Sequence, residues 1–290
     1  MTPLNVFSVD VEDYFQVSAF EPYLARDQWP DQESRVVANT QVLLRLIERH
    51  QVHGTFFVLG WVAERFPQLV REIHQSGHEL GSHSYWHRLV YEQSPDEFRS
   101  DLIRSRDVLQ QITGAAVTAY RAPSFSITAR SLWALEILAE EGFTADSSIF
   151  PIHHDRYGIP LAERRLHTIA TPAGPLQEFP PAVVRCGRWN LPVSGGGYFR
   201  LYPWAWSRFC FRRINRGGAP FMFYVHPWEV DPQQPRLGLG SRAARFRHHV
   251  GLASTEGKLE QLLQTFRFGR LCDVLAHHAA LPPTVSERAS

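Results

Sequence analysis

NVFSVDVED, residues 5–13, joins a strand-like apolar run to a cluster of three acids. A helical pattern follows over Asn39–His50, and a second strand-like run follows over Thr55–Leu59. Short apolar runs alternate with helical patterns in this way through the first two thirds of the chain, which is typical of parallel strands with helices crossing between them. The sequence therefore predicts an α/β fold.

The clearest helix begins after Ser94, because Ser94 can cap its N-terminus, Pro95 suits the first turn and Glu97 completes a capping box. Gly114 can take the left-handed conformation that ends this helix. Residues 151–220 are different, since they are rich in Pro, Gly and aromatic residues. We expect long loops or hairpins there, covering one end of a barrel.

Residues able to do chemistry follow each strand-like run. In parallel α/β barrels the carboxyl ends of the strands meet on one face, where active sites are built. Five separate segments would therefore bring polar side chains to one pocket. These are Asp10, Glu12 and Asp13 in the first run, His83 and His87 after Glu79–Ser82, Arg121 after Val117–Tyr120, Asp146 after Phe143–Ala145, and His226 after Phe221–Val225.

His83 and His87 are four positions apart, a spacing that on one helical turn places two imidazoles side by side. The pair alone is weak evidence, since His74 and His78 have the same spacing in a chain with 14 histidines. Two imidazoles with one carboxylate form the ligand set of a catalytic rather than a structural zinc site. A solvated turn is the alternative for the three acids, but in a buried strand they would repel one another without a cation or an arginine.

The composition excludes some partners. A formal net charge of +1, with arginines spread along the 290 residues, provides no basic footprint for nucleic acid. The apolar stretches are too short or too interrupted to insert into a membrane. The first residues show no signal-peptide pattern, and we expect a cytoplasmic protein. The oligomeric state stays open.

The ordered motifs resemble those of the NodB-type polysaccharide deacetylases, also called carbohydrate esterase family four. SVDVED at residues 8–13 looks like the family's Thr-Phe-Asp-Asp, and HSYWH at 83–87 fits its His-Ser/Thr-x-x-His. RAP at 121–123, DSS at 146–148 and VHP at 225–227 resemble the later motifs, and GTFFV at 54–58 is also typical. The resemblance implies a distorted (β/α) barrel of the NodB type, with extra loops and a C-terminal extension.

The resemblance extends over residues 5–230. It predicts a NodB-like deacetylase barrel over residues 1–230, with residues 231–290 as an extension packed on the same domain. DVEDY, DSSIFP and HPWE resemble a subgroup linked to bacterial exopolysaccharide loci that accompany exosortase systems. An association with the envelope polysaccharide machinery is expected on this basis.

The family's roles carry over to matching positions as implications of the resemblance. Asp10 would be the general base, Arg121 would hold Asp10 ionised, and His226 would protonate the leaving amine. His83, His87 and a first-strand carboxylate would bind a divalent cation, zinc first, with cobalt, nickel or manganese as alternatives. A backbone N–H near Ser124 would stabilise the oxyanion.

The sequence departs from the family pattern in the carboxylate motif and around the sugar pocket. Val11 separates Asp10 from the other acids, so the ligand is either Glu12, which shares a face with Asp10 in an extended strand, or Asp13, which a turn would bring in. Asp13 is preferred because it completes the pair of aspartates. Ser124 replaces the usual aromatic residue, with Phe125 one place later.

The partner that tunes His226 is also unidentified, because Ile149 stands where an acid often precedes the aromatic residue. Asp155 and Glu178 are the candidates. Loop aromatics could stack on sugar rings, although such residues are more often local core, and the tail pair His248/His249 is expected to be solvated. The predicted substrate-binding residues are Ser124, Phe125, Asp146, Phe150 and Trp228, with Tyr198 and Trp189 as weaker candidates.

The predicted function is metal-dependent hydrolysis of N-acetyl groups from an N-acetylated polysaccharide or oligosaccharide, with release of acetate. One alternative is an amidohydrolase acting on a small cyclic amide or imide, as in allantoinase-like relatives. An open aromatic groove would favour the polymer, and a closed pocket capped by residues 151–220 would favour the small molecule. The other alternative is a non-catalytic sugar-binding relative, which would need neither a base nor an acid.

Overall fold

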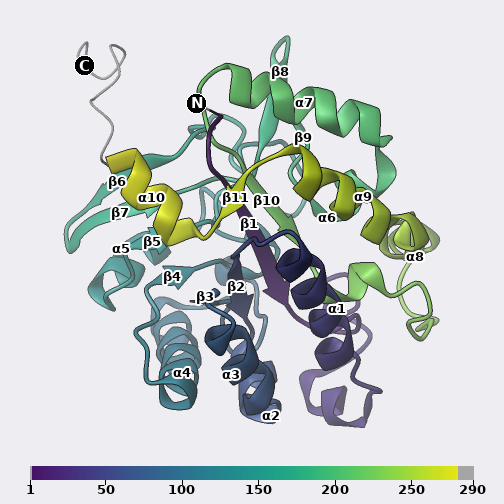
Figure 1. The fold of residues 1–290 in the computed structure, drawn as a ribbon. Helices are drawn as coiled ribbons and strands as arrows, with labels where there is room; N and C mark the ends of the chain where they lie inside the picture. Colours follow the sequence, from purple (N-terminus) through teal and green to yellow (C-terminus); the bar gives the residue numbers. More distant parts are fainter. Residues whose placement is uncertain (1, 280–290) are drawn as a thin grey trace.

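The computed structural model describes residues 2–279, and its first strand, β1 (Asn5–Val11), is buried along its whole length. Neighbouring layers cover both faces of β1, which explains why the segment is nearly continuously apolar. β1 lies inside a curled sheet, between β2 (Thr55–Val58) and β10 (Met222–Val225), and both pairings are parallel (Figure 1). The carboxyl ends of these three strands therefore face the same side.

The sheet confirms the predicted α/β class. Its neighbouring strands are parallel except for an antiparallel hairpin at one edge, and its curvature gives a distorted half-barrel rather than a closed one. The strand order is β10, β1, β2, β3 (Glu79–Ser82), β4 (Ala119–Tyr120), β5 (Ala145–Asp146), β7 (Gly174–Glu178) and β6 (His167–Thr171), with β11 (Phe268–Gly269) also paired to β1.

Helices pack around the sheet (Figure 1). They are α1 (Val36–Arg49), α2 (Gly60–Arg65), α3 (Pro67–Gln75), α4 (Pro95–Thr113), α5 (Trp133–Glu140), α6 (Gly196–Leu201), α7 (Trp204–Arg216), α8 (Arg242–His249), α9 (Leu252–Thr265) and α10 (Leu271–Ala279). Short 3-10 helices lie in the connections: η1 (Arg26–Asp31), η2 (Val90–Glu92), η3 (Pro123–Phe125) and η4 (Pro227–Val230).

Helix α4 has the ends predicted from its sequence. The Ser94 hydroxyl accepts the Glu97 N–H, the Glu97 carboxylate accepts the Ser94 N–H at 2.8 Å, and Gly114 takes φ 70° after the last turn. A left-handed residue at this point costs a glycine little, because glycine has no Cβ. Local signals alone were therefore sufficient for this element.

Residues 151–220 contain more regular structure than predicted. Besides the β6–β7 hairpin they form a second hairpin, β8 (Val183–Cys186) with β9 (Trp189–Pro192), followed by α6 and α7. The sequence concealed α7 because no side chain caps its first turn, which Pro203 precedes, and because two of its large apolar side chains, Trp206 and Phe209, are 42% and 52% exposed. Gly195 then bridges to Tyr224 of β10, and a Cβ at Gly195 would lie 1.9 Å from the Tyr224 carbonyl oxygen.

The C-terminal part of the chain packs on the barrel through β11, which pairs with β1, and through α9, which contacts η4. The boundary at residue 230 stays a prediction, and residues 280–290 of the predicted extension lie outside the described residues. Within residues 2–279, no helix combines the length and the apolar character needed to cross a bilayer.

His78 provides a pH-dependent contribution to stability. Its ring is 6% exposed, its Nδ1 accepts the Gly54 N–H at 3.2 Å, and burial, with the charges of His53 and Arg270, lowers its pKa to about 4. The unfolded chain binds this proton nearer pH 6.5, so the contribution is complete above that pH and is lost as the pH falls toward 4. With allowance for solvent screening, we expect a loss of about 2 kcal/mol.

Urea unfolding at about pH 7 and about pH 4.5 measures this loss. His78→Asn keeps an acceptor near the position of Nδ1 but cannot titrate, so its free energy of unfolding should fall less between the two pH values. An equal fall in both proteins would assign the pH dependence to other groups.

Candidate active site

The carboxyl ends of β1, β3, β4 and β10 bring six predicted residues into one buried cluster, as the strand pattern predicted. Side-chain contacts join its members, which are Asp10, Glu12, His83, His87, Arg121 and His226. All except His226 are less than 4% exposed as whole residues. Charged groups are buried at this density only where they neutralise one another or bind an ion.

Glu12, His83 and His87 form the one group of three suitable ligands that could hold a metal ion in residues 2–279. Glu12 Oε2 lies 2.7 Å from His87 Nε2 and 4.0 Å from His83 Nε2. Two ligand atoms about 2.0 Å from a tetrahedral zinc are roughly 3.3 Å apart, so these separations fit one shared ion. The close contact with His87 is not aligned as a hydrogen bond, and Glu12 Oε2 accepts none from the other described residues, as expected of an atom whose natural partner is a cation.

The protonation states of this group also suit a cation. Burial alone raises the pKa of Glu12, but the His87 imidazole, followed by those of His226 and His83, lowers it to about 2. Burial lowers the pKa of His83 to about 4, so its ring is neutral near pH 7. His83 Nδ1 lies 2.8 Å from the Arg121 carbonyl oxygen and donates to it, which leaves Nε2 free as a ligand.

The two imidazoles converge through a loop, not through the helical turn predicted from their spacing. His83 directly follows β3, and both Ser84 (φ 64°) and His87 (φ 54°) have left-handed backbone conformations. Ser124 and Phe125, in the loop after β4, have φ of 51° and 53°. Non-glycine residues pay for such conformations and keep them where the surrounding structure requires a particular geometry, so the strain makes this region a candidate for function.

The preference for Asp13 as the carboxylate ligand is corrected by the geometry. Its carboxylate turns to the start of α1, where it accepts the Ser34 hydroxyl at 2.6 Å and the N–H groups of Arg35 and Val36 at 3.0 and 3.2 Å. A carboxylate is stabilised at this end of a helix, because the first N–H groups lack partners and the dipole is positive there. Glu12 instead follows β1 directly, with its N–H donating to the Asp10 carbonyl oxygen at 3.0 Å, and its carboxylate lies 2.7 Å from His87.

Arg121 is fully buried and holds Asp10 in place. Its Nη1 donates to Asp10 Oδ1 at 2.6 Å and to the Ser8 hydroxyl at 2.9 Å, while Nη2 donates to the Ser147 hydroxyl at 3.0 Å. Its guanidinium also lies over the Phe57 ring, 4.2 Å from the centroid. The contact with Asp10 is a single short bond to one oxygen rather than the bidentate pair predicted. The second oxygen, Oδ2, is 3.8 Å from His226 Nε2.

The partner of His226 is Glu229, and neither predicted candidate takes this role. His226 Nδ1 lies 2.6 Å from Glu229 Oε1, and Glu229 Oε2 accepts Arg200 Nε at 2.6 Å. Asp155 is 77% exposed and pairs with His154, whereas Glu178 lies beside Asp146 across the β5–β7 ladder. A signal was present in the sequence, since HPWE places an acid three positions after the histidine, where a capping box would have it.

The chain His226–Glu229–Arg200 fixes both the orientation and the charge of the imidazole. Burial alone would lower the pKa of His226, but the hydrogen bond to Glu229 and the charges of Glu12, Glu229 and Asp10 raise it to about 9. His226 Nε2 points at the other carboxylates, 3.8 Å from both Asp10 Oδ2 and Glu12 Oε1. The ring can therefore hold a proton at the atom that faces the cluster.

Trp228 is buried in the core of the site and does not lie where it could stack on a sugar ring, although such stacking was predicted. It is 5% exposed, its ring stacks between those of His226 and His248 at centroid distances of 5.1 and 4.4 Å, and its Nε1 donates to Glu12 Oε1 at 3.2 Å. His248 is accordingly buried rather than solvated, and its Nε2 lies 2.9 Å from Gln234 Oε1. Trp228 supports the ligand Glu12 and the ring of His226 instead of contacting solvent.

The remaining predicted substrate-binding residues lie near the cluster but are mostly buried. Asp146 is fully buried beside Glu178, and burial raises the pKa of both carboxyl groups. Asp146 Oδ2 and Glu178 Oε2 are buried without other hydrogen-bond partners among the described residues, which is consistent with a proton shared between the two groups. Phe125 and Phe150 pack edge-on at 5.2 Å. Ser124 contacts the Ser18 hydroxyl at 2.7 Å. Of the weaker candidates, Trp189 is 53% exposed on the β8–β9 hairpin and Tyr198 is half-buried in α6.

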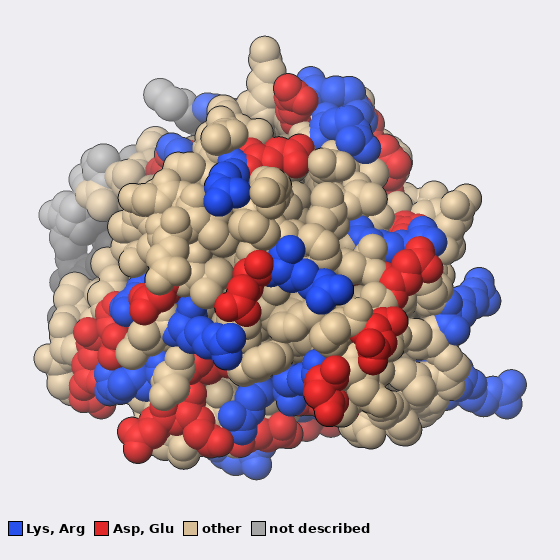
Figure 2. Space-filling model, turned by 90° about the horizontal axis from the view of Figure 1, so that it is seen from below, with Lys and Arg blue, Asp and Glu red and all other residues tan. Residues whose placement is uncertain are grey.

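The segment between β1 and α1 covers part of the cluster. The closed pocket considered from the sequence would instead have been capped by residues 151–220. In this segment the Ser18 hydroxyl contacts that of Ser124. The same segment also lines a small hollow beside His87, through Phe15, Gln16, Val17, Glu21, Leu24, Arg26 and Trp29. The His226 side chain, 18% exposed, is the most accessible part of the cluster. Seen from below, the side to which the carboxyl ends of the strands point in Figure 1, acidic and basic side chains are interspersed without a continuous basic stripe (Figure 2).

Comparison with known proteins assigns the two parts of the chain differently. Residues 23–144 match the family model "Polysaccharide deacetylase", and residues 147–276 match "Domain of unknown function (DUF3473)". The chain is 35% identical over 117 residues to a peptidoglycan-N-acetylglucosamine deacetylase of Bacillus cereus, covering 40% of this chain and 41% of that protein. It is 30% identical over 130 residues to a peptidoglycan deacetylase of Helicobacter pylori, covering 43% of each. The chain thus spans about two fifths of these curated relatives.

Solved structures share the fold over nearly the whole chain. A structure from Mycobacterium smegmatis assigned to the polysaccharide deacetylases superposes with a TM-score of 0.63 at 19% identity, covering 98% of this chain and 93% of that one. An allantoinase superposes with a TM-score of 0.60 at 16% identity, covering 97% and 92%. At these identities the likeness concerns the fold alone, and both predicted enzyme classes use it.

Proposed function

We propose that this chain, whose residues 23–144 match the polysaccharide deacetylase family, hydrolyses N-acetyl groups of an N-acetylated glycan with a bound divalent cation. The observation that carries the proposal is the single buried cluster in which Glu12, His83 and His87 lie beside the Asp10–Arg121 pair and His226. An acetamide is a poor electrophile with a poor leaving group, and this cluster offers a base, an acid and a cation site together.

Glu12, His83 and His87 would hold the cation, with zinc as the first candidate and cobalt, nickel or manganese as alternatives. When bound, it supplies Lewis acidity toward the acetamide carbonyl and toward an attacking water. Asp10 accepts the proton of that water, since Arg121 holds one of its carboxylate oxygens and leaves the other facing the site. His226 delivers a proton to the leaving amine from Nε2, while Glu229 holds its Nδ1. The Ser124 N–H, in its strained loop, serves the developing oxyanion.

The decisive assay loads the purified chain with zinc or cobalt, offers N-acetylglucosamine oligomers and measures released acetate. We expect release from the metal-loaded protein and its loss after chelation. Comparing oligomers of different sugars extends this assay to the prediction that an exopolysaccharide is the natural polymer. A cytoplasmic place of action is a separate prediction from the sequence.

A second candidate is supported by the enclosure of the site. With the cluster covered and His226 as its most exposed part, a small cyclic amide or imide is favoured over a polymer. Activity on a cyclic imide with none on any acetylated oligomer would favour this amidohydrolase. Inactivity on both, with zinc bound, would favour a non-catalytic sugar-binding relative.

The choice of Glu12 over Asp13 as ligand has a direct test. Glu12→Gln should weaken zinc binding by more than about 100-fold, because even outer-shell partners of a metal ligand are worth about 10–100-fold. Asp13→Asn is the matched control: an adjacent, buried acid loses its charge, but its oxygen can still accept the N–H groups at the start of α1. Its zinc affinity should stay close to wild type.

Competition with a chromophoric chelator measures both affinities without any substrate. The reverse order, with Asp13→Asn losing zinc and Glu12→Gln keeping it, would restore the aspartate as the ligand.

A further inference from the structure

A second polar site lies near the start of β10, the strand whose other end leads into His226. A hollow of about 180 Å³ is bounded by Arg164 and Arg165 ahead of β6, by Arg185 of β8 and by Arg213 of α7. Buried Phe179, Val183 and Phe221 contribute to its apolar lining. Phe221 immediately precedes β10 and His226 immediately follows it, so about 16 Å of extended chain separates the hollow from the catalytic cluster. This hollow is therefore a separate feature.

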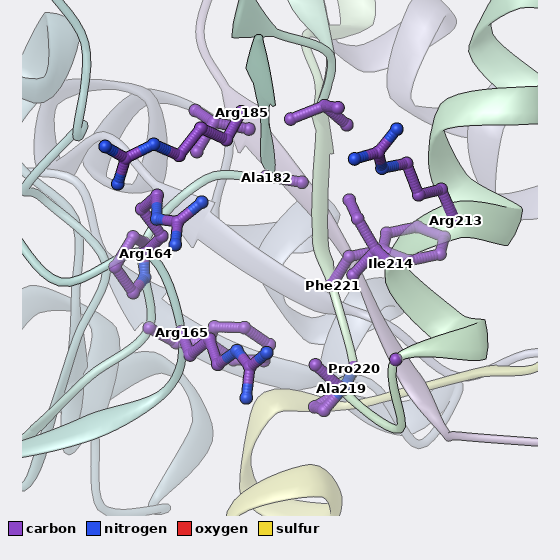
Figure 3. Close-up of a pocket in the computed structure, with 14 residues that line it drawn as sticks. Arg164, Arg165, Ala182, Arg185, Arg213, Ile214, Ala219, Pro220 and Phe221 are labelled. Atoms are coloured by element: carbon purple, nitrogen blue, oxygen red, sulfur yellow. The ribbon is translucent and has the colours of Figure 1, made fainter. Parts of the chain in front are cut away.

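The arginines of this hollow face it from different elements. Arg164 and Arg213 extend toward it from opposite sides and Arg165 lies at its lower edge, while the Arg185 guanidinium turns away (Figure 3). Two segments far apart in the chain, residues 164–165 and α7, thus contribute cations to one concave surface. Like charges gathered in this way repel one another unless an anion lies between them.

Within the described residues, no carboxylate lines the hollow. In residues 2–279 the arginine ion pairs are made by other arginines: 26, 35, 49, 88, 99, 104, 106, 121, 200 and 270. The acid nearest in sequence, Glu163, points its carboxylate at the backbone N–H groups of Arg164 and Arg165. The guanidinium groups therefore remain available to an external anion.

We propose that this basic hollow binds the oxyanion group of a small anionic ligand, a phosphate or a carboxylate. Guanidinium groups match both anions because their planar N–H forks donate to two oxygens at once. The volume is below the roughly 300–1,000 Å³ of sites that enclose a whole small molecule, so the hollow takes the charged group and one adjoining sugar-sized ring on its apolar lining. The site does not depend on the proposed deacetylase reaction.

The test titrates the full chain at low salt with three probes: inorganic phosphate, glucose 1-phosphate and glucuronate, each followed by calorimetry. Binding of the two phosphates alone identifies a phosphate site, and binding of glucuronate identifies a carboxylate site. Arg213→Met and Arg164→Met should each weaken binding about tenfold or more, since a charge-assisted hydrogen bond is lost. Added salt should weaken it in the wild type.

Arg216→Met is the matched control, because Arg216 is an exposed arginine one turn further along α7 that does not line the hollow. It should bind as the wild type does, and all three variants should keep the wild-type melting temperature and zinc affinity. The proposal is overturned if none of the three probes binds, or if Arg216→Met weakens binding as much as Arg213→Met. Acetate release plays no part in this readout, so the failure of either proposal would be seen separately.

Discussion

Replacing Asp10 with asparagine is expected to lower kcat/KM for acetate release by about 10²–10⁴-fold, because a general base usually accelerates a reaction by this factor. The asparagine oxygen can still accept the Arg121 Nη1–H that Asp10 Oδ1 accepts now. The buried guanidinium therefore keeps a partner and the chain should fold. What disappears is the only group in the proposed mechanism that takes the proton of the attacking water.

The metal readout separates this loss from a general disturbance of the site. Asp10 is not in the ligand group of Glu12, His83 and His87, so Asp10→Asn should bind zinc with nearly wild-type affinity while losing activity. His226→Ala should show the same separation, because it removes the acid and no ligand. Wild-type acetate release by Asp10→Asn would assign the base to another residue, and loss of zinc would make Asp10 part of the metal site.

The fold was predictable where local chemistry decides it. β1, β2, β3 and α4 follow from apolar runs and capping residues that are complete within the segment. β4 and β5 are only two residues long, because the chain there turns into loops that place Arg121 and Ser147, and no local signal marks that ending. Helix α7 escaped prediction because, unlike α4, it has no side-chain cap at its start.

The candidate site shows the same division. Strand ends predicted which side chains would meet, and the structure brings six of them together. The sequence could not decide between Glu12 and Asp13, since the outcome depends on whether α1 presents its free N–H groups to one of them. Arg200 was missed altogether, because a buried arginine in a weakly patterned region resembles the many surface arginines until its partner Glu229 is placed beside it.

Arg200→Met is expected to cost about 3–5 kcal/mol of stability, the range for breaking a buried ion pair and leaving one charge alone. Arg200 and Glu229 have side chains 2% and 1% exposed, so solvent cannot replace the lost partner. The same guanidinium donates at 2.7 Å to the carbonyl oxygens of His248 and Val250, where α8 ends. The variant should therefore also loosen the packing of α8 on the site.

A double-mutant cycle with Glu229→Gln apportions this cost between the two partners. If Arg200 acts mainly through the carboxylate, the double variant should be less destabilised than the sum of the single variants by at least about 1 kcal/mol, as contacting residues usually are. Denaturant unfolding measures the cycle, and Arg208→Met, at an exposed arginine of α7, is the control expected to change stability by less than about 0.5 kcal/mol. Strictly additive losses would mean that Arg200 stabilises the chain through the carbonyl groups alone. In that case Glu229 would hold His226 without its help, and Arg200 would contribute packing but no electrostatic support to the proposed acid.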